Sequence, residues 1–584
     1  MDPQANFRGR RVFCRTRRRT RARRVGRLSK KRQEEFVFAP LGGVGEIGMN
    51  LGLYGYGREG ARKWIAVDLG ITFPSETQPG IERIMPDIRF LEEERDNLLG
   101  IVLTHAHEDH YGAVGDLWPR LGAPVYATPF SAGLLRAKMA EERIHAPIPL
   151  KEVALGGSIE LGPFAIRFVT TTHSIPEPNG LIIETAAGTA YHSGDWKIDG
   201  APQIGGPTDI AALKELGARG CRALICDSTN ATREGVSPSE GDVAQTLKSL
   251  IAEAPERVAV TAFASNVARL RSVALAAHAA GRRTILIGRA MHRVVTVARE
   301  AGYLHDVPDF LTEHDFKQLP RNEVVLLVTG SQGESRAALA RIAQGNHPAV
   351  SLAAGDRVIF SSRTIPGNEK AVGQVQNALV RAGMDVITDA DGLVHVSGHP
   401  RRGELVQLYD WLKPEVAIPV HGEARHLAAH AKLARERGVR EVVTIFNGDM
   451  VRLAPGPAAI IDELPSGRLH KDGRITVAED DEALRERRRL SFNGLVVVAL
   501  TVTSKGELVA EPEVRLLGIP SADEEGGSML ELVYDTIDSV ITSIPKPRRK
   551  DADLLREAVR RGVRATLGEV WGKRPVCEVM VTRI

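Results

Sequence analysis

A dense cluster of possible metal ligands spans six positions, His105-Ala106-His107-Glu108-Asp109-His110. The apolar run 98–103 directly before it is typical of a buried strand, so the cluster begins where that strand ends. His105 and His107 are two residues apart, which in an extended chain points both imidazoles to one side, whereas Asp109 and His110 enter a turn. Imidazole and carboxylate together suit Zn²⁺ or Mn²⁺, and the divided geometry predicts two ions. A polar, histidine-rich surface loop is the alternative.

Two more histidines and an aspartate follow strand-like runs elsewhere. His173 comes after the β-rich run 168–172, and His421 comes after the apolar run 416–420. Asp195 follows a strand-like approach and a glycine turn that can present its carboxylate. Each of these residues alone has an ordinary structural interpretation. Because a two-metal centre needs a bridging carboxylate and additional imidazoles, we expect all three to complete the ligand set.

A glycine-rich motif lies upstream of the histidine cluster. Residues 43–48 form G-x-G-x-x-G, and Asp68 stands twenty residues further on, as in a dinucleotide-binding site. The segment 49–57 has the pattern of a strand and turn rather than the helix that such a site requires. We therefore interpret the motif as a turn. Asp68, in the strand-like run 64–70, is interpreted as a carboxylate that orients a metal ligand.

Residues 226–399 alternate apolar strands with alanine-rich helical stretches. Strands are expected at 257–263, 284–287 and 324–328. Polar strand ends are expected at 226–230, 264–266 and 329–334. The alternation predicts a parallel sheet covered on both faces. Because ligands bind at the carboxyl ends of parallel strands, and Gly- and Ser-rich ends offer amides to anions, these ends are expected to line a phosphate-binding cleft.

The order of the patterns predicts a divided first domain. Residues 36–225 carry the histidine cluster, and residues 400–465 resemble strand and helix material that continues the same domain. The stretch 226–399 would be an insertion within it. A Gly- and charge-rich linker is expected at 466–490, before a C-terminal domain at 491–584. That domain has no ligand-like cluster, so dimerisation or RNA contact is its expected role.

Composition limits the class of protein. The length of 584 residues indicates three or four domains, and the 43% hydrophobic and 26% charged content is that of a soluble globular protein. No apolar run approaches the roughly 18 residues of a membrane span, so no transmembrane helix is expected. The four cysteines form no disulfide-like framework, which fits a reducing cytoplasm.

Positive charge is concentrated in residues 1–35, which hold 14 Lys and Arg against three acidic residues, while the remainder is mildly acidic. We interpret this segment as a basic, disordered extension. Non-specific affinity for nucleic-acid phosphates is one alternative. A transit peptide is another, although the serine content and apolar face of such peptides are missing.

Taken together, these motifs resemble the metallo-β-lactamase superfamily and, within it, the β-CASP nucleases, with most similarity to the bacterial ribonuclease J family. The resemblance runs from Phe36 to the C-terminus. Its motifs are at 41–48, T-H-A-H-E-D-H at 104–110, 171–176, 194–195, 227–230, 263–266, T-G-S-Q-G-E at 329–334, 366–368 and 421–423. It implies an α/β fold: a metallo-β-lactamase αββα sandwich, an inserted β-CASP parallel-sheet domain and a small α+β C-terminal domain.

The resemblance also implies roles for individual residues. One ion would lie on His105, His107 and His173, the second on Asp109, His110 and His421, with Asp195 bridging them. Asp227 would be the proton donor and His399 the proton acceptor. Substrate contacts are implied for Phe263, Ala264, Ser265, Ser331, His395, Val396, Ser397, Gly398 and His399. Relatives often have Ala or Thr where this chain has Val396. A structural calcium ion is implied at Asp472, although the flanking sequence departs from the family pattern.

The implied activity is hydrolysis of single-stranded RNA, both as a 5′→3′ exonuclease that prefers a 5′-monophosphate and as an endonuclease, in mRNA decay and rRNA maturation. Two divalent ions would assist attack of water on phosphorus and leave 5′-phosphate products. A cytoplasmic homodimer or tetramer with other RNA-decay proteins as partners is expected. A β-CASP nuclease of DNA, a small-molecule hydrolase of the same superfamily and a catalytically dead scaffold are the alternatives, and the complete ligand set counts against the last.

Overall fold

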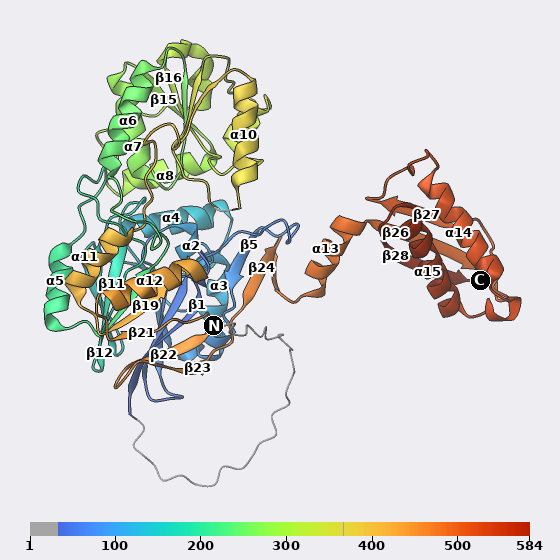
Figure 1. The fold of residues 1–584 in the computed structure, drawn as a ribbon, viewed down its shortest axis with the longest axis horizontal. Helices are drawn as coiled ribbons and strands as arrows, with labels where there is room; N and C mark the ends of the chain where they lie inside the picture. The colour runs from blue at the N-terminus through green and yellow to red at the C-terminus, as the bar shows by residue number, and fades with distance from the viewer. Residues whose placement is uncertain (1–32, 366) are drawn as a thin grey trace, which may run out of the picture.

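The computed structural model describes residues 33–365 and 367–584. Figure 1 shows a two-lobed body and, apart from it, a C-terminal domain joined by a single helix. The basic extension expected at 1–35 lies almost entirely outside the described residues. Within the described ranges, no helix combines the length and apolarity needed to cross a membrane.

One lobe contains two facing sheets. The first has the strand order β23-β22-β1-β3-β4-β6-β7-β8. Its strands are β1 (Glu35–Gly42), β3 (Leu51–Gly57), β4 (Lys63–Val67), β6 (Leu98–Val102), β7 (Val125–Ala127), β8 (Leu150–Glu152), β22 (Asp449–Ala454) and β23 (Ala459–Glu463). The second has the order β21-β19-β13-β12-β11-β10-β9. Its strands are β9 (Ser158–Leu161), β10 (Phe164–Thr170), β11 (Asn179–Thr185), β12 (Gly188–His192), β13 (Ala223–Asp227), β19 (Val416–Val420) and β21 (Glu441–Val442).

The two sheets share one apolar core. Phe38 and Tyr54 of the first sheet pack with Phe164 and Phe168 of the second, because alternate residues of each strand point inward. Helices cover the outer faces: α1 (Arg89–Glu93), α2 (Glu108–Tyr111), α3 (Val114–Leu121) and α4 (Pro129–Glu141) on the first sheet, and α5 (Ile210–Arg219), α11 (Arg402–Leu412) and α12 (Ala424–Glu436) on the second. The predicted αββα sandwich is confirmed.

Segments from both ends of the chain meet in this lobe. β19 pairs in parallel with β13, and β22 pairs antiparallel with β1. A short parallel pair, β2 (Val44–Gly45) and β20 (Gly422–Glu423), joins the glycine motif to the residues after His421. The motif leads into strand β3 and not into a helix, as predicted. These pairings support a first domain made from two separate parts of the chain.

The second lobe is a parallel sheet with the strand order β15-β16-β14-β17-β18. Its strands are β14 (Val258–Thr261), β15 (Arg283–Ile287), β16 (Val324–Val328), β17 (Arg357–Phe360) and β18 (Asp385–Ile387). Its helices are α6 (Glu240–Glu253), α7 (Val267–Ala279), α8 (Arg289–Glu300), α9 (Ala338–Ala343) and α10 (Glu369–Arg381). One face of the sheet packs against α6, α7 and α8 and the other against α9 and α10, as the βαβ pattern predicted.

The polar segment 226–230 does not belong to this second lobe. Its first two residues end β13, which lies between β12 and β19 in the seven-stranded sheet. The sequence interpretation that grouped 226–230 with the strand ends of the inserted sheet is therefore wrong. A local apolar run cannot indicate which of two sheets its strand joins, because that depends on pairing partners distant in sequence.

The expected linker at 466–490 contains regular structure. β24 (Arg468–Asp472) pairs with β25 (Ile475–Ala478) and with β5 (Arg83–Pro86) in a small sheet. α13 (Glu482–Asn493) then bridges to the C-terminal domain (Figure 1). The segment does connect two parts of the protein, but as a hairpin and a helix, because β24 finds a partner strand almost 400 positions earlier.

The C-terminal domain is a small α+β unit. Its sheet has the order β27-β26-β28, from β26 (Leu495–Val502), β27 (Glu513–Leu517) and β28 (Val576–Arg583). α14 (Met529–Ser543) and α15 (Ala552–Val570) pack on one face, which buries alternate residues of β26. The predicted α+β class of this domain is confirmed.

Candidate metal centre

The loop after β6 and the segment after β10 together form a first group of possible ligands. His107 Nδ1 lies 3.1 Å from His105 Nε2 and 3.0 Å from His173 Nε2. Asp195 Oδ2 lies 3.8 Å from His105 Nε2 and 3.6 Å from His173 Nε2. His105 and His107 therefore face one point, as their spacing predicted, and His173 and Asp195 join them there.

Asp109 and His110 lie in α2, which begins at Glu108, and face a second point, where His421 joins them. His110 Nε2 lies 3.6 Å from Asp109 Oδ2 and 3.2 Å from Asp195 Oδ2. His421 Nε2 lies 3.8 Å from Asp109 Oδ2 and 3.5 Å from Asp195 Oδ1. Asp195 thus belongs to both groups: its Oδ2 lies near His105, His173 and His110, and its Oδ1 lies near His421. The arrangement can hold two cations that share one carboxylate.

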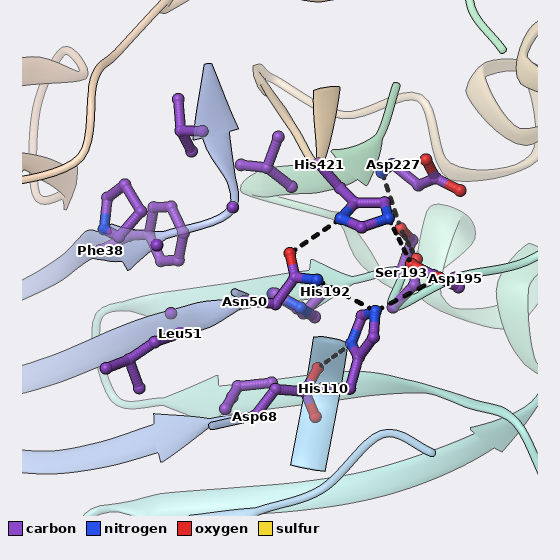
Figure 2. Close-up of a pocket in the computed structure, with 18 residues that line it drawn as sticks. Phe38, Asn50, Leu51, Asp68, His110, His192, Ser193, Asp195, Asp227 and His421 are labelled. Atoms are coloured by element: carbon purple, nitrogen blue, oxygen red, sulfur yellow. Dashed lines mark hydrogen bonds and ion pairs between the residues drawn. The ribbon is translucent and has the colours of Figure 1, made fainter. Parts of the chain in front are cut away.

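Acceptors behind the imidazoles fix which ring nitrogen faces the centre (Figure 2). His110 Nδ1 donates to Asp68 Oδ2 at 2.7 Å, so Asp68 lies where the sequence predicted an orienting carboxylate. Asp68 also accepts from the amide and hydroxyl of Thr104. His173 Nδ1 donates to Gly398 O at 2.7 Å. In the neutral form each imidazole then keeps its one hydrogen on Nδ1 and its Nε2 lone pair toward the centre. Burial lowers the pKa of His110, but the carboxylates of Asp195, Asp109 and Asp68 outweigh burial and raise it well above its usual value, so a bound cation would take the place of its Nε2 proton.

Asp227 and His399 form a pair beside the two groups. His399 Nδ1 lies 2.8 Å from Asp227 Oδ2, and its ring packs between those of His173 and His421 at centroid distances of 5.0 and 5.5 Å. Burial lowers the pKa of His399, but the carboxylates of Asp227 and Asp195 outweigh burial and raise it to about 9. The pair can therefore hold and exchange a proton next to the centre.

The segment 395–399 crosses from the inserted domain to this centre. Ser397 Oγ accepts from Asn230 Nδ2 at 2.9 Å, and Gly398 supplies the carbonyl that orients His173. Val396 is buried. Burial, together with nearby cations, lowers the pKa of His395 well below its usual value, and His395 Nδ1 is buried without a partner in the described structure. This segment therefore presents polar groups between the two lobes, beside the metal centre.

The other predicted substrate residues stand further from the ligands. Phe263, Ala264 and Ser265 follow β14, and Ser331 follows the neighbouring strand β16. In the part of the chain that the structure describes, no hydrogen bond or ion pair joins these four to the ligand residues. Their position at the carboxyl ends of adjacent parallel strands is the one that the sequence predicted for a ligand cleft.

Three arginines, which we name the arginine group, lie beside the segment 395–399: Arg233, Arg363 and Arg401. The amide after Arg401 donates to Arg233 O at 2.9 Å, and Arg363 Nη1 lies 3.5 Å from Asn230 Oδ1. Burial and the charge of neighbouring arginines lower the pKa of Arg233 and Arg363. None of the three pairs with a carboxylate among the described residues. The carboxylate of Asp389 acts on the pKa of Arg233 and Arg363 in the opposite direction, but the three arginines outnumber it, and clustered cations of this kind indicate a surface for an anion.

Sequence interpretation missed the arginine group and Asn50. Asn50 Oδ1 accepts from His421 Nδ1 at 2.9 Å. A signal existed for both, since Asn50 stands two residues after the glycine motif and Arg401 stands two residues after His399. Neither position indicates a functional residue until the fold shows which distant segments meet.

The calcium ion implied at Asp472 stays a prediction, and the structure places this carboxylate beside an arginine. Asp472 Oδ2 pairs with Arg487 at 2.5 Å. Among the described residues, the groups of three or more potential metal ligands all lie in the centre above, and none includes Asp472. The guanidinium of Arg487 offsets the charge of Asp472, so this carboxylate joins β24 to α13 and attracts a further cation less strongly.

Comparisons with known families cover most of the chain. "Ribonuclease J, beta-CASP domain" matches residues 255–379, and "Ribonuclease J C-terminal domain" matches 482–584. "Beta-lactamase superfamily domain" matches 64–254, and "Zn-dependent metallo-hydrolase RNA specificity domain" matches 383–445.

Individual relatives belong to the same family as the matching domains. Ribonuclease J of Sinorhizobium meliloti is 53% identical over 551 residues, which cover 94% of this chain and 98% of the relative. Ribonuclease J2 of Bacillus subtilis is 34% identical, with 94% of this chain and 99% of the relative covered. A crystal structure of a protein of unknown function from Enterococcus faecalis V583 aligns with a TM-score of 0.51 at 15% identity, over 72% of this chain and 100% of that chain, which shows a shared fold.

Proposed function

Because this chain belongs to the ribonuclease J family and is a metal-dependent ribonuclease, we propose in finer terms that it hydrolyses single-stranded RNA with two divalent ions. It acts as a 5′→3′ exonuclease that prefers a 5′-monophosphate and as an endonuclease. The observation that carries the proposal is the meeting of ligand residues from four separate segments in two groups that share Asp195. The Asp227–His399 pair stands directly beside them.

The residues of the centre fit two cations. Asp195 Oδ1 and His421 Nε2 are buried without hydrogen-bond partners among the described residues. A buried polar atom without a partner costs about 1–3 kcal/mol, which a bound cation would offset. Burial lowers the pKa of His105 and His173 well below the usual value, so both imidazoles are neutral and can donate lone pairs. Imidazole with carboxylate suits Zn²⁺ or Mn²⁺.

The bridging carboxylate stays anionic. Burial raises the pKa of Asp195, but His110, His421 and His399 outweigh burial and hold it well below its usual range. We assign one ion to His105, His107 and His173 and the other to Asp109, His110 and His421, with Asp195 between them.

Two divalent ions bound there would supply the positive charge that polarises the phosphodiester and favours ionisation of the attacking water. Asp227 Oδ2 accepts the Nδ1 hydrogen of His399, so Nε2 is the nitrogen at which His399 takes up and releases its second proton. We assign His399 as the proton acceptor and Asp227 as the proton donor. The 3′ oxygen leaves, and the products carry a 5′-phosphate.

The seam between the two lobes is the proposed RNA path. The arginine group would hold backbone phosphates beside the centre. Ser331 and Ser397, with nearby amides and His395, would hold a terminal 5′-phosphate, while Phe263, Ala264 and Ser265 line the path. A pocket for the terminal phosphate places the first linkage at the ions and gives stepwise trimming from the 5′ end. Internal cleavage requires the lobes to separate enough to admit a continuous strand.

We propose the cytoplasm as the site of action, with mRNA decay and rRNA maturation as the processes. A homodimer or tetramer is proposed, with the C-terminal domain as one contact surface and other RNA-decay proteins as partners. Three cysteines of the described chain, Cys221, Cys226 and Cys577, are buried and unpaired, which suits a reducing compartment.

The experiment that tests the proposal compares four substrates with the wild type and His107→Ala: RNA with a 5′-monophosphate, RNA with a 5′-triphosphate, circular RNA, and DNA of the same sequence. The wild type should degrade monophosphorylated RNA fastest from its 5′ end and also cut circular RNA. His107→Ala should fold yet lose cleavage by several orders of magnitude.

Three outcomes would contradict parts of the proposal. Cleavage retained by His107→Ala would remove the two-ion centre. Equal rates on mono- and triphosphorylated RNA would remove the 5′ preference. Faster cleavage of DNA would favour the β-CASP nuclease of DNA, since the proposed attack by water does not use the RNA 2′-hydroxyl.

A further inference from the structure

Asn50 contacts every residue that joins Asp195 in the second ligand group. Its Oδ1 accepts from His421 Nδ1 at 2.9 Å, and its Nδ2 donates to Asp109 O at 3.0 Å. The same Nδ2 lies 3.1 Å from His110 Nε2, the nitrogen assigned to the ion, so a bound cation would replace this contact. Figure 2 shows the amide between the rings of His110 and His421, on the side away from Asp227. One neutral side chain therefore links three ligands from the two ends of the first domain.

The contact with His421 determines which of its nitrogens can bind a cation. Because Oδ1 of Asn50 is an acceptor, the imidazole hydrogen of His421 stays on Nδ1 and the lone pair stays on Nε2. His421 Nε2 is the atom that is buried without a partner and faces Asp195 Oδ1 at 3.5 Å. Without this acceptor, the hydrogen could move to Nε2 and block that position.

The first glycine of the G-x-G-x-x-G motif makes room for Asn50. Gly43 has a φ of +84°, and a Cβ there would lie 2.3 Å from Asn50 Oδ1. The Gly43 carbonyl also accepts the backbone amide of His421 at 2.7 Å. The motif that resembles a dinucleotide site therefore positions His421 through both its backbone and the side chain of Asn50.

We propose that Asn50 is a positioning residue that sets the affinity of the Asp109–His110–His421 group for its ion, and that Gly43 is required for that role. The inference rests on the two-ion centre of the proposed function. Loss of a hydrogen-bond partner behind a metal-bound histidine weakens metal binding about 10–100-fold. The effect should fall on one ion, because Asn50 does not contact His105, His107 or His173.

The test is a titration of the full-length, metal-free protein with Zn²⁺ in competition with a chromophoric chelator, which measures ions per chain and two dissociation constants without RNA. Asn50→Leu keeps the approximate shape but removes the acceptor. Gly43→Ala keeps Asn50 and displaces its oxygen. Asn50→Asp keeps an acceptor. Asn179→Ala is the matched control, because Asn179 is a buried asparagine beside Thr104 with no contact to a ligand side chain.

Asn50→Leu and Gly43→Ala should each weaken one ion about 10–100-fold and leave the other unchanged. Asn50→Asp should fall between the wild type and Asn50→Leu, and Asn179→Ala should match the wild type. The melting temperature of each metal-free variant separates positioning from folding. Unchanged affinity in Asn50→Leu, or equal weakening of both ions with a large fall in melting temperature, would overturn the inference alone. A wild type that binds fewer than two ions would overturn the two-ion centre and this inference with it.

Discussion

Removing the arginine group should reduce the salt dependence of RNA binding by a predictable amount. Arg233, Arg363 and Arg401 are partly exposed, are close enough for the charge of one to lower the pKa of another, and form no ion pair with a carboxylate among the described residues. In the proposed path each would neutralise one phosphate. For single strands, each neutralised phosphate contributes about 0.7 to the slope of log affinity against log salt.

The expected magnitude follows from that slope. Arg363→Ala should lower the slope by about 0.7, and the triple alanine variant by about 2. When the salt concentration rises from 50 to 200 mM, each phosphate contact lowers the RNA affinity about 2.6-fold. The triple variant lacks three such contacts, so its affinity should fall about 18-fold less over this range than that of the wild type. Arg363→Lys should keep the slope, because the charge is retained, while losing part of the affinity that depends on the planar guanidinium.

Fluorescence anisotropy of a labelled single-stranded RNA measures these slopes in a His107→Ala background, where cleavage cannot interfere. Arg219→Ala is the matched control, because Arg219, on the outer helix α5, already pairs with Glu184 of β11 and with Glu215 of the same helix. Circular dichroism confirms that each variant is folded. A triple variant with the slope of the wild type would show that the arginine group does not hold RNA phosphates.

Three further predictions concern protonation. Asp68→Asn cannot accept from both Thr104 and His110, so the Mn²⁺ concentration for half-maximal RNA cleavage should rise about 10–100-fold; an unchanged concentration would exclude an orienting role. Asp227→Asn removes the main cause of the raised His399 pKa of about 9, so the acid limb of the pH–rate profile should move to lower pH, and a stationary limb would exclude His399 as acceptor. Burial lowers the pKa of His430 from 6.5 to about 4, so folding excludes a proton and stability falls as pH drops through this range. Urea unfolding of the metal-free protein measures how much the free energy of unfolding falls between pH 7 and pH 5. The fall should be about 2 kcal/mol smaller in His430→Asn than in the wild type, and equal falls would contradict this assignment.

Much of the fold could be predicted from local patterns. The strand expected at 324–328 coincides with β16, and the strand expected at 284–287 differs from β15 by one residue. Alternation of apolar strands and helices is a local property, because each βαβ unit buries its own apolar surface. The segments 226–230 and 466–490 were misjudged because their structure depends on partners far away: β13 on β19, and β24 on β5.

The metal centre also has some features that local sequence predicts and others that it does not. The spacing of His105, His107, Asp109 and His110 sufficed to predict two facing directions, because backbone geometry alone separates an extended pair from the start of a helix. The segment 395–399 was assigned to substrate from the resemblance, whereas its carbonyl at Gly398 also orients His173 across 225 positions. No local pattern indicates that second role.

By itself, the sequence determined the types of ligand, their order along the chain and the alternation that builds both lobes, since these depend on neighbours within a few residues. Only the tertiary structure decided which nitrogen of each imidazole faces the centre, that Asn50 supports His421 from 371 positions away, and that three arginines gather beside the segment 395–399. Those features arise where β2 meets β20 and where loops of two domains pack together. Long-range pairing of strands and loops creates these features, and the spacing of residues along the chain does not predict that pairing.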